Sequence, residues 1–454
     1  MIQSVNPVSG EIIATYEKHS FNEVDTIIHQ CAKAHKGWAK EGFDRRSALM
    51  LKASEILRTQ ANRFARMITL EMGKPIKQSR AEVLKCAKVC DYYAENASTF
   101  LANEKVKTAA SESYIAFRPL GVVLAIMPWN FPFWQVFRFA APALMAGNGA
   151  LLKHASNVTG SALMIEQIFK EAGFPEHLFR TIKLAGKETA SVISHDLVKA
   201  VTLTGSVGAG KAVAGKAGSG IKKSVLELGG SDPYIILEDA DLEKAVDVCV
   251  NSRVINSGQS CIAAKRFIVV KEVQQRFEQL FVEKMKEKVM GDPMSDETEI
   301  GPQATPSLRD ELHAQVTSSI EMGATCLLGG EIPKQTGAWY PPTVLSHVKK
   351  GMPAYDEELF GPVAAIIEAT DETDAIRIAN DSVFGLGAAI FTKNIERGQQ
   401  IAEKEIQAGC CFVNEMVQSD PRLPFGGIGA SGYGRELSYA GIREFTNIKT
   451  VYVK

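Results

Sequence analysis

Cys261 is the residue of this chain whose neighbours best suit it to act as a nucleophile. It lies in the stretch NSGQSCIAAKRF, after small, flexible residues and before an apolar run that predicts a strand. A thiol on such a loop is open to a substrate, and local dipoles can lower its pKa. Because most cysteines pack as small apolar residues, this stretch indicates covalent catalysis only in combination with other reactive groups.

Glu227 is the first of these groups. In SVLELGGSD it ends an apolar run just before Gly229 and Gly230. Ligands of open α/β sheets bind in the crevice at the carboxyl ends of the strands, and a carboxylate there can serve as a general base. The alternative interpretation of Glu227 is a surface carboxylate at a turn.

Asn130 and Arg138 are polar residues in an apolar segment, MPWNFPFWQVFR, that should be buried. A buried amide needs hydrogen-bond partners. The backbone can supply them for Asn130, or its NH2 group can point at a developing oxyanion. The guanidinium of Arg138 requires a carboxylate once it is buried, and that carboxylate could come from the protein or from a substrate.

The segment Gly205–Lys211 reads GSVGAGK and matches the GxxxxGK part of a phosphate-binding loop. The next residue is Ala212, where a nucleotide hydrolase needs Ser or Thr to hold magnesium. A strand is predicted before the segment and a helix after it, so its backbone could still bind a phosphate at the helix N-terminus. A nucleotide hydrolase is therefore a rival hypothesis, and a pyrophosphate contact is favoured.

The N-terminal third of the chain, which must help to position these groups, is predicted to be helical. Residues 22–40, 44–71 and 74–102 are predicted helices, because their apolar residues recur at helical spacing among mixed charges. Gly73 and Pro75 separate the second helix from the third.

From Gly121 onward, short apolar runs alternate with helical segments. This alternation predicts a parallel sheet with helices packed on its faces. A second α/β block begins near Ser231, and the tail EFTNIKTVYVK is β-rich. The fold class is therefore α/β.

Charge and composition exclude several functions. The net charge is -1 and no extended basic patch is present, so we expect no nucleic-acid or anionic-membrane partner. Residues 119–137 carry no charge over about the width of a membrane. Pro128, Asn130 and Pro132 in this stretch would leave backbone groups unpaired in lipid, which favours a buried strand, turn and helix.

The cysteines indicate a reducing, cytoplasmic location. The chain has eight, scattered and without a CxxC motif, which is typical of free thiols in a protein of this size. The start, MIQSVNPVSGEII, does not read as a secretory signal. Cys86 and Cys90 share one face of a predicted helix and are expected to pack in the core rather than bind a metal, so no metal site is predicted.

Seven stretches in register resemble the aldehyde dehydrogenase superfamily over essentially the whole chain. They are PWNFP around Asn130, LLKHASN around Lys153, LTGS at Gly205–Ser206, LELGG at Glu227, GQSC at Cys261, EELFGP at Glu358–Phe360, and PFGGIGASGYGRE ending at Glu436. Within the superfamily the chain most resembles succinate-semialdehyde dehydrogenases, especially a shorter bacterial branch.

The resemblance implies a fold of three parts. A Rossmann-like dinucleotide-binding domain would comprise residues 1–98 and 120–229, and an α/β catalytic domain residues 230–431. Residues 99–119 and 432–454 would form a β-rich oligomerisation arm. Such an arm implies a homodimer or a homotetramer.

The resemblance also implies roles for the residues singled out above. The Cys261 thiolate would attack the aldehyde, the Asn130 amide would stabilise the oxyanion, and Glu227 would activate water for hydrolysis of the thioester. Glu358 would hold the nicotinamide ribose and Phe360 would pack near the ring. The other residues expected to line the cofactor are Trp129, Lys153, Gly205 and Ser206.

Ser156 bears on the choice of cofactor. Relatives that prefer NAD often carry a glutamate three residues after the lysine that corresponds to Lys153, and here that position is Ser156. A small neutral residue removes the repulsion against a 2′-phosphate. NADP is therefore the expected cofactor, and NAD remains usable.

The substrate expectation rests on three further positions. In the succinate-semialdehyde branch, two arginines and a serine meet the far carboxylate of the substrate, and the matching residues here are Arg138, Arg266 and Ser419. Two guanidinium groups would favour aldehydes with a distal carboxylate through charge-assisted bonds. Either arginine could instead pair with a protein carboxylate, and glutarate semialdehyde or an aliphatic aldehyde is the alternative substrate.

Two departures from the family pattern are visible. Ala263 stands where some relatives carry a second cysteine, so a disulfide switch with Cys261 is excluded at that position. His154 replaces a proline that is more common after the lysine. A further hypothesis is that the chain is a catalytically silent relative of these enzymes. The presence of Cys261, Glu227 and Asn130 together argues against it.

Overall fold

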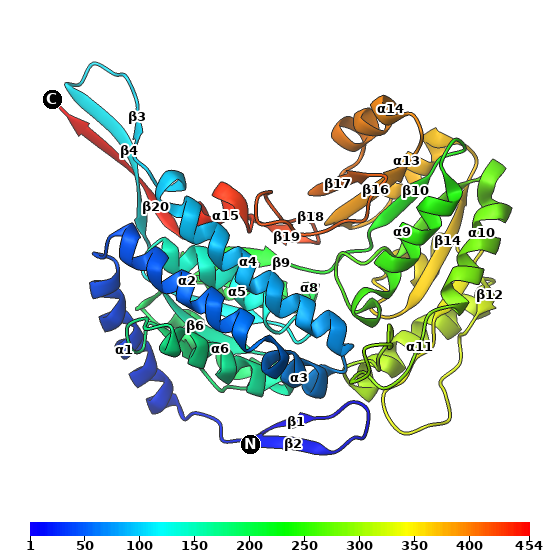
Figure 1. Ribbon diagram of the computed structural model, residues 1–454. Coiled ribbons are helices and arrows are strands. Elements are labelled where there is room, and N and C mark those ends of the chain that lie inside the picture. The colour runs from blue at the N-terminus through cyan, green and yellow to red at the C-terminus, as the bar shows by residue number, and fades with distance from the viewer.

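The computed structural model describes residues 1–454 and contains two α/β units and a protruding β-rich arm (Figure 1). The two units lie side by side, each built on its own sheet, and the arm extends from the first unit. The α/β fold class predicted from the strand–helix alternation is confirmed.

Five parallel strands form the sheet of the first unit. In spatial order they are β9 (Lys223–Glu227), β8 (Val198–Thr204), β5 (Val122–Met127), β6 (Gly149–His154) and β7 (Phe179–Thr181), and the short β19 (Gly432–Tyr433) joins β9 in the antiparallel sense. The connections contain α5 (Trp134–Met145), η1 (Ser156–Val158), α6 (Thr159–Glu171), η2 (Gly186–Glu188), α7 (Thr189–Ser194) and α8 (Val207–Ser219).

Helix α5 is buried along its whole length. It packs against β5 and β6 on one side and against helices of the N-terminal third on the other. This position explains the uncharged stretch at 119–137, which forms β5, a turn and the start of α5. Across the structure, every helix is too short or too polar to qualify as a membrane-spanning segment.

The N-terminal third contributes a hairpin and four helices, of which the first packs against the first sheet and the other three pack against α5 or α6 (Figure 1). These are β1 (Ile2–Val5), β2 (Ile12–Tyr16), α1 (Phe21–Trp38), α2 (Phe43–Thr59), α3 (Ala61–Met72) and α4 (Ile76–Phe100). The single helix predicted for residues 44–71 is wrong, because the chain turns at Gln60, which ends α2 and begins α3. The predicted break at Gly73 is confirmed by its left-handed backbone (φ +76°).

The second unit has a seven-stranded sheet in which only the edge strand β12 is antiparallel to its neighbour. In spatial order its strands are β12 (Thr325–Leu328), β13 (Thr343–Ser346), β14 (Val363–Ala369), β11 (Arg266–Val270), β10 (Pro233–Ile236), β16 (Gly387–Phe391) and β17 (Cys410–Val413). Its helices are α9 (Leu242–Val254), η3 (Ile255–Gly258), α10 (Lys271–Lys286), α11 (Pro306–Glu321), α12 (Pro353–Asp356), α13 (Glu372–Asn380), α14 (Ile395–Gln400) and η4 (Ile401–Glu405), and β15 (Phe384–Gly385) pairs with β18 (Ile428–Gly429).

The arm consists of β3 (Glu104–Lys105), β4 (Glu112–Pro119) and β20 (Thr446–Val453). Strand β20 pairs with β4 in the antiparallel sense along its whole length. Ile448 and Tyr452 on β20 are exposed apolar residues.

The predicted boundary of the arm at residue 432 is wrong. Residues 432–433 form β19 in the sheet of the first unit, and α15 (Ser438–Glu444) packs against α4 and α5. Leu437 and Ile442 belong to the same apolar core as α5. The second part of the arm therefore begins only at Thr446, because the segment before it buries apolar side chains that the arm could not cover.

Candidate active site

Two cavities meet at Cys261. The larger cavity, of about 290 Å³, is lined by Pro128, Trp129, Asn130, Gln135, Thr204, Gly205, Ser206, Leu228, Gly229, Cys261, Leu308, Glu311, Glu358 and Phe360. The smaller cavity, of about 140 Å³, is lined by Lys85, Phe131, Trp134, Gln135, Arg138, Ser252, Ile255, Ser260, Cys261, Ile262, Met416, Val417, Gln418, Ser419 and Phe425. Cys261 and Gln135 line both, so a thiol stands between two separate binding spaces.

The loop before Cys261 has an unusual backbone that fixes the position of the thiol. Asn256, Ser257 and Gly258 all have positive φ, a conformation that costs free energy for residues other than glycine. At Gly258 a Cβ atom would lie 2.1 Å from the Gly361 carbonyl oxygen, so only glycine fits. The Ser257 hydroxyl accepts a hydrogen bond from the Gly301 N–H at 2.9 Å, which helps hold the loop.

Asn130 faces this loop from the turn before α5. Its side-chain Nδ2 donates to the Gln259 carbonyl at 3.0 Å, and its Oδ1 accepts from Gln135 Nε2 at 3.1 Å. Asn256 Nδ2 donates to the Asn130 carbonyl at 2.7 Å. Since an amide nitrogen carries two N–H groups, one remains available to a ligand beside Cys261.

Glu82 on α4 binds the turn before α5 that carries Asn130. One carboxylate oxygen accepts the N–H groups of Phe133 and Trp134 at 2.8 and 3.0 Å, at the start of α5. The other oxygen forms a buried ion pair with Lys74. A carboxylate bound to the first N–H groups of a helix is favoured by the helix dipole, and this arrangement fixes the turn that carries Asn130.

The thiol of Cys261 is protonated in the ligand-free protein. Burial raises its pKa to about 12, although the cations of Lys265 and Arg138 act in the opposite direction. Lys265 donates to the carbonyls of Ser260 and Cys261 at 2.8 and 2.7 Å and pairs with Glu358 at 3.3 Å. The attacking thiolate therefore depends on a base and on ligands that complete the site.

Glu227 lies at the end of β9 but lines neither cavity. Both carboxylate oxygens are buried without a hydrogen-bond partner, and one lies against Gly426. Burial and the nearby carboxyl of Glu436 raise the pKa of Glu227 well above its usual value. In this conformation Glu227 lies against Gly426 and outside both cavities, and its raised pKa favours the protonated form.

The larger cavity has groups that suit a dinucleotide. Trp129 and Phe360 meet edge to face, with ring centroids 5.8 Å apart. Glu358 accepts the Gly230 N–H at 3.0 Å and reaches so close to Gly229 that a Cβ there would lie 2.3 Å from its other oxygen. The carboxylate oxygens of Glu358 can accept hydrogen bonds from ribose hydroxyls.

The segment Gly205–Lys211 does not form the loop of a nucleotide hydrolase. Strand β8 ends at Thr204 and α8 begins at Val207, so most of the GSVGAGK segment is helical and Lys211 is exposed on the helix. Ser206 caps α8 by accepting the Ala209 N–H at 3.3 Å. Gly205 and Ser206 thus place the N-terminus of a 13-residue helix at the larger cavity, where backbone N–H groups can meet a phosphate.

A third cavity, of about 720 Å³, continues past Trp129 and contains Ser156. Ser156 is exposed and begins η1, directly after the end of β6. Lys153 on β6 is buried without an acidic partner, and its burial lowers its pKa. Because Trp129 lines this cavity as well as the larger one, a single extended ligand can reach from Cys261 to Ser156.

The structure separates the two arginines that were predicted to act together. Arg138 lines the smaller cavity, forms a buried ion pair with Glu436 and donates to Thr204 Oγ1 at 3.2 Å. Arg266 does not line the cavity. It is buried in β11, and its guanidinium donates to the carbonyls of Ser231, Ile378 and Ala379 at 2.9 to 3.0 Å. The prediction that Arg266 binds substrate is therefore wrong, because its donors are used to tie α13 to the sheet.

Ser419 does line the smaller cavity, where it meets a residue that the sequence interpretation missed. Lys85 on α4 donates to Ser419 Oγ at 2.7 Å, and its Nζ lies 4.1 Å from the centre of the Trp134 ring. In the sequence, Lys85 looks like one of several lysines on an amphipathic helix, so no local signal could have identified it.

His154 ties strand β6 to the turn that carries Trp129 and Asn130. Its Nε2 lies 2.9 Å from the Pro132 carbonyl, and its Nδ1 accepts the Ala155 N–H at 3.0 Å. Burial lowers the pKa of His154 to about 4. The imidazole is therefore neutral, and its two ring nitrogens contact the carbonyls of Pro132 and Met127, at 2.9 and 3.1 Å, which connects β6 to the turn. The sequence offered no interpretation of this residue.

One cluster has the residue types of a metal site, but its hydrogen bonds disfavour that role. Asp25, His29 and His195 lie on the surface of the first unit, with ligand atoms within 4.8 Å of one another. His195 Nδ1 accepts the Leu197 N–H at 3.1 Å, so Nε2 carries the proton and donates to Asp25 at 3.1 Å. A metal at that nitrogen would require the other tautomer.

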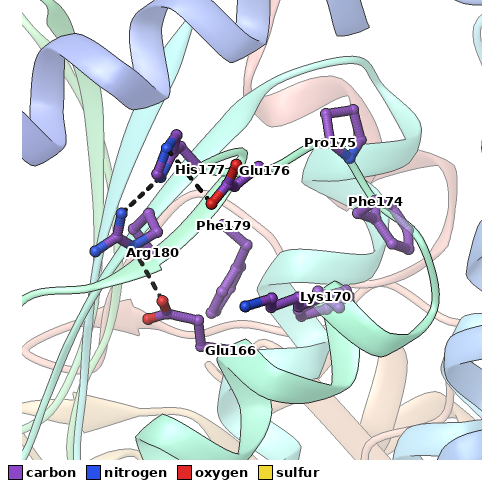
Figure 2. Close-up of a pocket in the computed structure, with 9 residues that line it drawn as sticks. Glu166, Lys170, Phe174, Pro175, Glu176, His177, Phe179 and Arg180 are labelled. Atoms are coloured by element: carbon purple, nitrogen blue, oxygen red, sulfur yellow. Dashed lines mark hydrogen bonds and ion pairs between the residues drawn. The ribbon is translucent and has the colours of Figure 1, made fainter.

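A further hollow lies beside α6 and β7 (Figure 2). Arg180 lies between Glu166, at 3.0 Å, and the ring of His177, at 2.7 Å, and Lys170 at the same hollow forms no ion pair. None of its residues lines either cavity at Cys261, so this hollow is separate from the candidate site.

Comparisons with known proteins identify the family of this chain. The sequence model described as the Aldehyde dehydrogenase family matches residues 1–451. The chain is 49% identical over 452 residues to a probable succinate-semialdehyde dehydrogenase for NADP(+) from Synechocystis sp., with 100% of this chain and 99% of the relative covered. It is 45% identical to a succinate semialdehyde dehydrogenase for NAD(P)+ from Escherichia coli K12, with 99% and 97% covered. The crystal structure of succinic semialdehyde dehydrogenase from Streptococcus pyogenes, in complex with NADP+, matches with a TM-score of 0.97 and 36% identity over 100% of both chains.

Proposed function

Because the chain belongs to the aldehyde dehydrogenase family, we propose that it oxidises succinic semialdehyde to succinate with NADP+ as the preferred electron acceptor. The observation that carries this proposal is the position of Cys261 between two cavities. The larger one suits the nicotinamide end of a dinucleotide, and the smaller one suits a short aldehyde with an anionic end.

The reaction begins with attack of the Cys261 thiolate on the aldehyde carbon. The free N–H of the Asn130 amide and the backbone N–H of Cys261 stabilise the oxyanion of the thiohemiacetal. A nicotinamide held in the larger cavity would supply the two-electron oxidation as acceptor of the hydride from that carbon, and Cys261 would then carry a thioester. Water then hydrolyses the thioester and releases succinate and the thiol.

Glu227 is the base that activates this water. Its side chain has to turn from Gly426 toward Cys261, since it lines neither cavity in the present conformation. Movement away from Glu436 and into a wetter space removes the two causes that raise its pKa. The same movement therefore delivers the carboxylate and ionises it.

The cofactor would be held by residues at or beside the larger and third cavities. Glu358 would bind the nicotinamide ribose, and Phe360, which contacts Trp129 edge to face, would pack near the ring. Gly205 and Ser206 would present the N-terminus of α8 to the pyrophosphate, and the buried ammonium of Lys153, which has no acidic partner, would lie near the adenosine ribose at the end of β6.

Ser156 provides a test of the cofactor preference. In Ser156→Glu, we expect kcat/KM for NADP+ to fall by roughly 100-fold, because a carboxylate would face the 2′-phosphate close to Lys153. The value for NAD+ should stay within about threefold or rise. Initial rates at 340 nm with each cofactor measure this, and Gln167→Glu, at an exposed position of α6 outside the cavities, serves as the matched control. A parallel loss with both cofactors would contradict the placement of the phosphate at Ser156.

The substrate assignment rests on the cationic lining of the smaller cavity by Arg138 and on the Ser419 hydroxyl. Initial rates with succinic semialdehyde, glutaric semialdehyde and butanal test it directly. We expect kcat/KM for succinic semialdehyde to exceed that for butanal by roughly 100-fold, since charge-assisted hydrogen bonds to the carboxylate are lost with butanal. The margin over glutaric semialdehyde should be about 10-fold, because one methylene discriminates weakly. If butanal is the better substrate, the assignment of succinic semialdehyde as the substrate is contradicted, whereas the assignment of Cys261 as the nucleophile is unaffected.

We also propose that the chain forms a homodimer or homotetramer through the arm. Strand β20 presents Ile448 and Tyr452 to solvent, and β17 is an unpaired edge of the seven-stranded sheet. Both features favour association with a second copy. Light scattering that gives the mass of one chain would contradict this.

We place the enzyme in the cytoplasm, because all eight cysteines are free thiols, including the proposed nucleophile. Its partner there is a small-molecule aldehyde. Thiol labelling in intact cells should therefore find no disulfide on this chain.

A further inference from the structure

Lys85 is a cation without an acidic partner at the wall of the smaller cavity. Its amino group donates to Ser419 Oγ at 2.7 Å and stands over the ring of Trp134, and it takes part in no ion pair. An ammonium carries three N–H donors, so two are left for another acceptor. The nearest acidic residue along the loop, Asp420, is already held by Arg422 through contacts of 2.6 and 2.8 Å.

The other cations expected to bind the substrate are already paired. The guanidinium of Arg138 is shared with Glu436, and that of Arg266 is used by three backbone carbonyls outside the cavity. Lys85 is therefore the cation of this site whose charge the protein itself leaves unmatched. Such a group is costly to bury unless a ligand supplies the counter-charge.

We propose that Lys85, together with Ser419, binds the far carboxylate of the semialdehyde and is the main specificity-determining cation of this enzyme. The Ser419 oxygen accepts from Lys85, which leaves its O–H free to donate to the same carboxylate. Lys85 thus takes the place that the resemblance had assigned to Arg266, and Arg138 supports the carboxylate from α5. The inference rests on the proposed function and names the residue that selects its substrate.

Lys85→Met tests the proposal, because it removes the charge and keeps an unbranched side chain. For succinic semialdehyde we expect kcat/KM to fall by roughly 10- to 100-fold, mainly through KM, as one charge-assisted contact is lost. For butanal, which has no carboxylate, the value should change by less than about threefold. Lys85→Arg should restore most of the activity. Lys88→Met, an exposed lysine on the same helix, is the matched control and should behave like the wild type.

The pH dependence gives a second, independent readout. Burial, followed by the positive charge of Arg138, lowers the pKa of Lys85 to about 8, and the acidic groups of Glu82 and Asp420 act in the opposite direction. The ammonium is present below this pKa and lost above it. The ratio of kcat/KM for succinic semialdehyde to that for butanal should therefore be constant below about pH 7 and fall as the pH rises through 8. Titration of Cys261 or Glu227 affects both substrates and cancels in the ratio.

Three results would overturn the inference. In Lys85→Met, kcat/KM could fall by the same factor for succinic semialdehyde and for butanal, which would assign Lys85 a purely structural role. In the same variant, kcat/KM could also stay unchanged for both aldehydes, which would leave Arg138 as the carboxylate ligand. The third result is that, in the wild type, the ratio of kcat/KM for succinic semialdehyde to that for butanal stays constant through pH 8 to 9. This measurement does not depend on whether Lys85→Met folds. Failure of the proposed function looks different, because wild-type enzyme would then show no preference for succinic semialdehyde over butanal at any pH.

Discussion

Cys261→Ala is expected to abolish the oxidation of succinic semialdehyde, with a loss in kcat of roughly four orders of magnitude or more. The thiol is the only group at the meeting point of the two cavities that can form a covalent bond to the aldehyde. Without it no thiohemiacetal forms, and the nicotinamide has no bound alkoxide from which to accept a hydride. Formation of NADPH followed at 340 nm measures the effect.

Cys411→Ala is the matched control for this prediction. Cys411 is a half-buried thiol on β17 that lines neither cavity at Cys261, so its removal should leave kcat within about twofold. Binding of NADP+ to Cys261→Ala, followed by calorimetry, should remain close to wild type because the larger cavity keeps its other lining residues. Retention of more than a tenth of the activity in Cys261→Ala would mean that another residue carries the chemistry.

Glu227→Gln is expected to convert steady turnover into a single burst. One equivalent of NADPH per active site should form rapidly, and the following steady-state rate should be lower than that of the wild type by roughly 10²- to 10⁴-fold. The amide has the shape of the carboxyl group but cannot take a proton from water, so the thioester forms and persists. Stopped-flow absorbance at 340 nm gives both the burst amplitude and the slow rate.

Glu238→Gln serves as the control, since Glu238 is an exposed glutamate shortly after β10 and should not affect either phase. The absence of a burst in Glu227→Gln would show that Glu227 is needed before the thioester forms. In that case its role would be deprotonation of Cys261, whose pKa of about 12 in the empty site leaves it a poor nucleophile.

The candidate site was predictable where the chemistry depends on residues within one short stretch. The positions of Cys261 and Asn130 follow from a glycine-containing loop before a strand and from a polar residue in a buried turn. Their juxtaposition is seen in the hydrogen bond from Asn130 to the Gln259 carbonyl. The predicted break at Gly73 follows from a backbone conformation that glycine adopts readily.

Other features could not be predicted, because they depend on contacts between distant segments. The chain gave no local reason for the break at Gln60, where α2 ends and α3 begins although both helices pack against α4 and α6. Likewise, residues 432–445 look like the approach to a β-rich tail. They fold back onto α4 and α5 because Leu437 and Ile442 complete a core built from the other end of the chain.

The sequence by itself determined that this chain is an α/β protein of the aldehyde dehydrogenase family, because hydrophobic periodicity and motifs in register are local properties. Only the tertiary structure decided which charges line the smaller cavity. Arg138 was predicted at the site and lies there, but Arg266 is used by three carbonyls and Lys85, more than 300 residues before Ser419 in the chain, lines the cavity instead. The free energy of a buried charge depends on every partner within a few ångströms, and those partners come from segments whose proximity only the folded chain establishes.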